Sequence, residues 1–110
     1  LIMQVYQGYQ LVFFTQQNRK LAGMTVAEWL LKTSKDLGIP GATMSLAQSG
    51  YGRDGKFHSA HFFELAEVPV EVLMAVTEEE CDGLFAEIDE AKLEIFYTKS
   101  PIEFGLTGQG

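Results

Sequence analysis

The sequence has few of the residues that stabilise small secreted or metal-bound domains. Its single cysteine, Cys81, excludes an intramolecular disulfide and the cysteine-rich classes of zinc site. Basic residues are also few, because eight Lys and Arg stand against fifteen Asp and Glu, for a formal net charge of −7. A chain this acidic does not attract nucleic acid or anionic lipid through its overall charge, so we expect no nucleic-acid partner.

Long apolar runs are missing as well. The longest are only a few residues, far short of the roughly 20 that a membrane-spanning helix needs. Residues 1–14 lack the basic start and apolar block of a secretory signal, and with the lone cysteine this leads us to expect a cytoplasmic protein. The hydrophobic content of 46% in 110 residues is ordinary for a globular protein, and we expect one domain over residues 1–110.

The hydrophobic pattern predicts strands that alternate with helices. We predict strands at residues 11–15, 42–49, 69–76 and 93–98, the third being rich in valine and central. Thr25–Glu28 and Thr77–Glu80 both match a capping box, and apolar residues follow each box at helical spacing. Gly38 and Pro40 are expected to end the first helix, and residues 101–110, with three glycines, to form a fraying tail.

This order predicts an α+β fold, a ferredoxin-like βαββαβ sandwich. It would have an antiparallel sheet, two helices on one sheet face, and a long loop between the second and third strands. The other sheet face would then lack a cover, which in so short a chain predicts self-association. Five aromatic residues are interpreted as core or subunit interface: Phe13, Phe14, Trp29, Phe62 and Phe63.

The segment from Gly50 to His61 is the candidate functional loop. Its Gly50–Gly55 portion matches G-x-G-x-x-G in spelling, but no helix is predicted after it, so we do not expect a dinucleotide site. The glycines could serve only as turn residues in a hairpin tip. Arg53 and Lys56 nevertheless form a basic island in an acidic chain, where backbone N–H groups and a guanidinium can hold a phosphate or carboxylate.

Other residues with chemical potential lie in or after this loop. His58, His61 and Glu64 could bind zinc or copper, but residues three apart on a strand point to opposite faces, so exposed or interface histidines are the favoured reading. Ser59 has no nucleophile elbow or orienting acid, and we predict no catalytic residue and no enzyme. Cys81 lies on the apolar face of the second helix and is expected in the core. Glu78–Glu80 are expected to stabilise that helix through its dipole.

Several segments, taken in order, resemble the PII-like branch of the nitrogen regulatory protein PII superfamily, long labelled a domain of unknown function. They are residues 38–43, 50–52, 58–61, 64–65 and 69–72. The likeness runs from about Leu11 to Gly105. It implies a ferredoxin-like homotrimer that senses adenine nucleotides and small metabolites in clefts between subunits. The loop over residues 50–67 would report the bound state to a partner protein, such as a membrane transporter or an enzyme.

The basic loop and the resemblance together predict a set of ligand-binding residues, namely Gly50, Tyr51, Gly52, Arg53, Lys56, His58, His61 and Lys92. Two features depart from the PII pattern. The connection Asp89–Lys92 is short and acidic where PII proteins have a glycine- and lysine-rich phosphate-binding turn, and residues 57–63 lack a tyrosine that could be uridylylated. Two alternatives stay open: a metal-responsive trimer that uses His58 and His61, and a structural oligomer without a ligand.

Overall fold

The computed structural model describes residues 4–47, 49–51, 57–59 and 68–108. These residues form a four-stranded antiparallel sheet in the order β4-β7-β1-β8, two short strand pairs and two helices. The elements are β1 (Val5–Gln16), β2 (Lys20–Leu21), β3 (Met24–Thr25), α1 (Val26–Asp36), β4 (Thr43–Leu46), β5 (Ser49–Tyr51), β6 (Phe57–Ser59), β7 (Pro69–Thr77), α2 (Glu78–Glu90) and β8 (Phe96–Gly105). The predicted α+β ferredoxin-like fold is confirmed.

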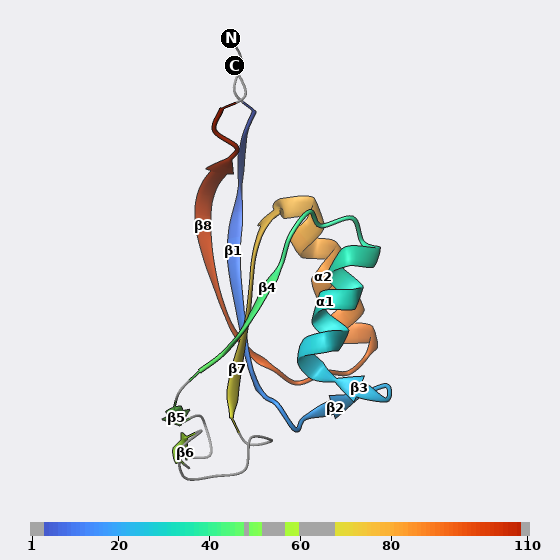
Figure 1. Ribbon diagram of the computed structural model, residues 1–110. Coiled ribbons are helices and arrows are strands. Elements are labelled where there is room, and N and C mark those ends of the chain that lie inside the picture. Colours follow the sequence, from blue (N-terminus) through green and yellow to red (C-terminus); the bar gives the residue numbers. More distant parts are fainter. Residues whose placement is uncertain (1–3, 48, 52–56, 60–67, 109–110) are drawn as a thin grey trace.

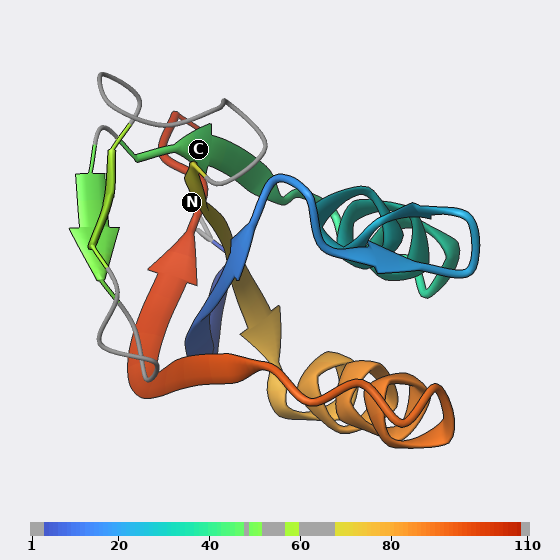
Figure 2. The ribbon, with the colours of Figure 1, turned by 90° about the horizontal axis from the view of Figure 1, so that it is seen from below.

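Both helices pack on the same face of the sheet and leave the other face open (Figure 1; Figure 2). Alternate residues of β1 and β7 point to the helices and are buried, as Leu11, Phe13, Val72 and Met74 illustrate. Helix α1 contributes Val26 and Leu30 to this core, and α2 contributes residues at helical spacing: Cys81, Leu84 and Ile88. The core therefore lies between one sheet face and the two helices.

The open sheet face is apolar at several positions. Phe14 of β1 pairs with Phe96 of β8, and their ring centroids are 5.5 Å apart. Phe96 is 53% exposed, and Leu73 of the neighbouring strand β7 is 42% exposed. These side chains alternate with the helix-facing residues of their strands, so they lie on the face away from both helices and stay partly exposed there.

Both helices begin where the capping boxes predicted. The Thr25 hydroxyl accepts a hydrogen bond from the Glu28 N–H at 3.1 Å. At α2 the box is reciprocal: the Glu80 N–H donates to the Thr77 hydroxyl, and the Glu80 carboxylate accepts from the Thr77 N–H at 2.9 Å. Gly38 follows α1 with φ of +83°, a conformation that favours glycine at a helix end. Neither helix in the described part of the chain is long and apolar enough to cross a membrane.

Strands β1 and β8 differ from the prediction at their ends. β1 begins at Val5 rather than residue 11, and β8 runs from Phe96 to Gly105 rather than over residues 93–98. The prediction of a fraying tail is therefore wrong for Pro101–Gly105. The reason is long-range pairing, because Val5–Phe14 and Phe96–Gly105 form one continuous ladder that satisfies their backbone groups.

Candidate functional site

The start of the candidate loop folds into a two-stranded hairpin. β5 and β6 pair antiparallel, with Gly50 opposite His58 and Tyr51 opposite Phe57. Residues Phe57–Ser59 therefore form a strand that pairs back on Ser49–Tyr51. A strand, not a helix, is thus the first described element after the G-x-G-x-x-G spelling, which agrees with the expectation that no dinucleotide site of that type is present.

The predicted ligand-binding residues fall into two groups. Gly50, Tyr51 and His58 lie on the β5–β6 hairpin, and Lys92 lies in the connection between α2 and β8. The remaining predicted residues, with the carboxylate of the metal alternative, lie outside the described residues: Gly52, Arg53, Lys56, His61 and Glu64. The predicted aromatic residues Phe62 and Phe63 lie outside them as well.

The two ends of the loop are anchored to the end of the sheet. The Ala47 N–H, after β4, donates to the Pro69 carbonyl at 2.8 Å. The Gln17 N–H, after β1, donates to the Val68 carbonyl at 3.1 Å. The residues just before and just after the loop are therefore joined to each other and to the end of β1. From this end of the sheet the β5–β6 hairpin extends on the side away from the helices (Figure 1; Figure 2).

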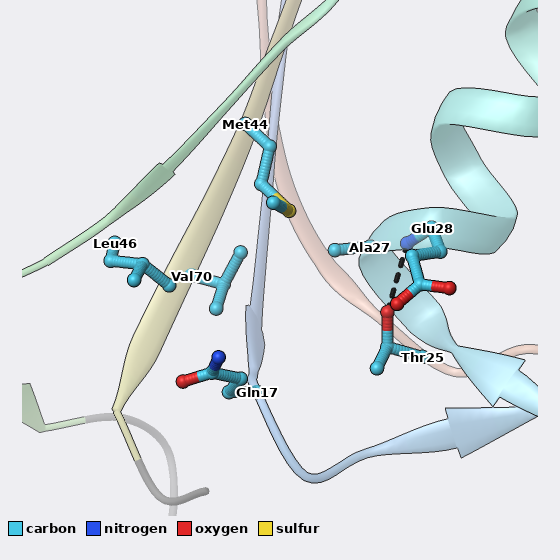
Figure 3. A pocket seen from close by; sticks show the side chains of 7 residues that line it. All are labelled: Gln17, Thr25, Ala27, Glu28, Met44, Leu46 and Val70. Atoms are coloured by element: carbon cyan, nitrogen blue, oxygen red, sulfur yellow. Dashed lines mark hydrogen bonds between the residues drawn. The ribbon is translucent and has the colours of Figure 1, made fainter. Parts of the chain in front are cut away.

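A small groove lies beside this anchor, between β4 and the first turn of α1 (Figure 3). It is lined by Gln17, Thr25, Ala27, Glu28, Met44, Leu46 and Val70. Met44 and Leu46 are 45% and 54% exposed although they lie on the helix side of the sheet, because α1 does not extend over the edge strand. The groove combines the apolar side chains of Met44, Leu46 and Val70 with the polar Gln17, Thr25 and Glu28. The buried Gln17 Oε1 has no hydrogen-bond partner among the described residues.

Arg19 is a basic residue near the candidate site that the sequence did not predict. The Arg19 guanidinium donates from Nη2 to the backbone carbonyl of Glu94. This contact joins the turn after β1 to the connection between α2 and β8, which carries Lys92 with φ of +54°. The sequence offered no local signal for it, because the two residues lie 75 positions apart. The α2–β8 connection therefore has two basic residues near it rather than Lys92 alone.

The surroundings of this connection remain unfavourable for a strongly held anion. Asp89 and Glu90 end helix α2 and are exposed, and the Lys92 N–H donates to the Asp89 carbonyl at 3.0 Å. A helix C-terminus also carries the negative end of the dipole. Arg19 offsets part of this negative charge, and the connection alone does not reproduce a phosphate-binding turn.

The remaining chemical candidates behave as structural residues. Cys81 is 1% exposed, as predicted for a core residue. Burial raises the pKa of its thiol above the ordinary value of 9.0, and the charge of Lys99 opposes this shift. Glu78, Glu79 and Glu80 occupy the first turn of α2, as expected for a dipole contribution. The described residues contain no group of three or more His, Cys, Asp or Glu that could hold a metal ion.

Comparison with known proteins agrees with these observations. The model of the DUF190 family, described as an uncharacterised ACR, matches residues 8–104. A UPF0166 protein of Aquifex aeolicus (strain VF5) is 30% identical over 87 residues, which are 78% of this chain and 83% of the relative. The chain therefore belongs to the DUF190 family, the PII-like family that the sequence resembles.

Solved structures share the fold at lower identity. CPII, a nitrogen regulatory PII-like protein from Thiomonas intermedia K12 solved with ADP, AMP and bicarbonate, has a TM-score of 0.67 and 21% identity, over 96% of this chain and 94% of CPII. CutA from Synechococcus elongatus PCC7942 has a TM-score of 0.54 and 16% identity, over 94% of this chain and 84% of CutA. These likenesses establish the common fold.

Proposed function

From membership of this family, we propose that the chain is a PII-like regulatory protein. It assembles as a homotrimer, binds a small anionic ligand, an adenine nucleotide, at clefts between subunits, and contacts a protein partner through residues 50–67. It acts as a binding protein and not as an enzyme.

The observation that carries the proposal is the pairing of Gly50 with His58 next to the anchored end of β4. This hairpin brings together the two parts of the loop that the family resemblance assigns to ligand contact. It emerges from the end of the sheet on the side away from the helices (Figure 1; Figure 2). A segment attached in this way is accessible to a ligand and to a partner at the same time.

The positive charges proposed to bind the anionic ligand come from two regions of the chain. Arg53 and Lys56 contribute from the loop, and the glycines beside them let the backbone N–H groups approach an anion. Arg19 and Lys92 contribute from the end where α2 meets β8.

The open sheet face supports the proposed trimer. Phe14, Leu73 and Phe96 form an apolar patch there, and Glu71 is the only charged residue among the described residues of that face. A face with large apolar side chains and a single charged residue, Glu71 opposite Phe14, is typical of a subunit interface.

Calorimetry and thermal shift with ATP, ADP and AMP, each with and without bicarbonate, test the ligand. We expect at least one nucleotide to bind and raise the melting temperature, and the pair Arg53→Ala and Lys56→Ala to weaken it at least tenfold. Lys32→Ala is the control, because Lys32 is an exposed partner of Asp36 on α1. No heat and no shift with any nucleotide would rule out the nucleotide part. A response to zinc alone that His61→Ala removes would favour the metal-responsive alternative.

A further inference from the structure

The ends of β1 and β8 form a ribbon that projects beyond the sheet. The last residue of β7 to pair with β1 is Thr77, opposite Gly8, so Val5–Gln7 pair only with Glu103–Gly105. In Figure 1 this ribbon rises above both helices with no other described element beside it. We call residues 5–8 and 102–105 the arm tip. An isolated two-stranded ribbon is marginally stable in water, so the arm tip needs a further contact to stay ordered.

The two faces of the arm tip differ in character. On one face the rings of Tyr6 and Phe104 stack, with centroids 5.4 Å apart and an interplanar angle of 25°. On the other face the Gln7 side-chain amide donates to the Glu103 carboxylate at 3.2 Å. The polar face is suited to water, whereas Tyr6 remains 43% exposed on the aromatic face.

Gly8 makes room for the Phe104 ring because it has no side chain. A Cβ built there would lie 3.0 Å from the Phe104 ring and 2.0 Å from the Val76 carbonyl oxygen. Only glycine therefore lets the Phe104 ring lie over β1 while β7 pairs on the other side. The position of the Phe104 ring beside Tyr6 therefore depends on glycine at position 8.

The aromatic face of the arm tip continues the open face of the sheet. Side chains alternate along a strand, so Tyr6 shares its side of β1 with Val12 and Phe14, and Phe104 shares its side of β8 with Phe96. Between the Phe14–Phe96 pair and the Tyr6–Phe104 pair this surface carries apolar Val12 and Ile102 and the polar but uncharged Gln10, Thr98 and Ser100. A partner for this surface must itself be apolar and nearly uncharged, and the same face of another copy meets that requirement.

We propose that the arm tip is an intersubunit contact, in which its Tyr6–Phe104 face packs on the open sheet face of a second copy of this chain. The inference rests on the self-association in the proposed function and not on its ligand. The contact adds Val5–Gln7 and Glu103–Gly105, which pair only with each other, to the interface of the open sheet face.

Substitutions on the two faces of the same strand test the contact. The double variant Tyr6→Ser with Phe104→Ser is compared with Val5→Ser with Gln7→Ser, which alters the opposite face. Mass is measured by light scattering over a concentration series. We expect the first variant to raise the dissociation constant of the assembly at least tenfold and the second to change it less than twofold. Equal effects of the two variants, or a wild type that is monomeric throughout the series, would overturn the proposal.

Hydrogen exchange on the unaltered protein gives a second readout that does not depend on the variants folding. In the assembled protein the amides of residues 5–7 and 103–105 should exchange at least a hundredfold more slowly than in an unstructured chain. Exchange at the unstructured rate would refute the contact. If no nucleotide binds, the light-scattering and hydrogen-exchange results can still support the arm contact. If the arm contact is refuted, the nucleotide titration can still support ligand binding, so the two proposals are tested separately.

Discussion

The two faces of the four-stranded sheet are formed by the same four strands, but their side chains have different surroundings. Phe13 and Phe14 are consecutive residues of β1, yet Phe13 is fully buried under α2 and Phe14 lies on the open face next to half-exposed Phe96. The covered face is complete within one subunit. The open face is equally rich in large apolar side chains and is left without a partner by the described residues.

This difference indicates which interactions fold the subunit and which assemble it. Residues on the covered face contribute to unfolding free energy at any protein concentration, because their partners lie in the same chain. Residues on the open face contribute through association, and their contribution therefore depends on concentration. Substitutions on the two faces should therefore differ in how their effects depend on protein concentration.

The largest effect is expected from Phe13→Ala on the covered face. Phe13 packs against Phe85 of α2 and Tyr97 of β8, with centroid distances of 5.9 and 6.2 Å. Removing the ring leaves a cavity in the core and should lower the free energy of unfolding by about 3–5 kcal/mol. Urea unfolding followed by circular dichroism measures the loss, which should be the same at low and high protein concentration. A loss that disappears on dilution would contradict the division between the faces.

A smaller and concentration-dependent effect is expected from Phe96→Ser on the open face. Burying a half-exposed ring stabilises an interface by about 2 kcal/mol, which corresponds to more than a tenfold change in dissociation constant. Light scattering should show dissociation at higher concentration than for wild type. Ser100→Ala on the same strand and the same face is the control, since it removes no ring. A variant that assembles like wild type would show that the interface lies elsewhere.

Loss of the α2 capping box should have a smaller effect on stability than either aromatic substitution. Thr77→Ala removes the hydroxyl that accepts from the Glu80 N–H and should lower stability by about 1 kcal/mol. The cap is internal to one subunit, so the change in urea midpoint should not vary with concentration and the oligomer mass should stay unchanged. Thr25→Ala removes the corresponding single bond at α1 and serves as the comparison. Dissociation caused by either change would mean that the helix starts contribute to assembly.

The covered face was also the part that the sequence predicted best. Thr25, Thr77 and the spacing of Cys81, Leu84 and Ile88 are local signals, and both helices form where these signals placed them. The strand ends were missed because Val5–Gln10 and Ser100–Gly105 are ordered by pairing with each other across about the full length of the chain. The same holds for the site, since no local pattern connects Arg19 with the carbonyl of Glu94.

The smallest expected effect concerns the pH dependence of stability and comes from Cys81 in the core of the covered face. Burial raises the pKa of its thiol above 9.0, so in the interval between 9.0 and the folded-state pKa the unfolded chain loses this proton while the folded chain keeps it. The folded state then binds more protons, and the free energy of unfolding falls as pH rises, by at most about 1.4 kcal/mol per pH unit. Below pH 9.0 the contribution is fully present. Urea unfolding between pH 8 and 10.5 should therefore show a steeper decline in wild type than in Cys81→Ala, whose other titrating groups are the same. Parallel curves would show that the thiol ionises as readily in the folded core as in the unfolded chain, which would contradict the complete burial of this face within one subunit.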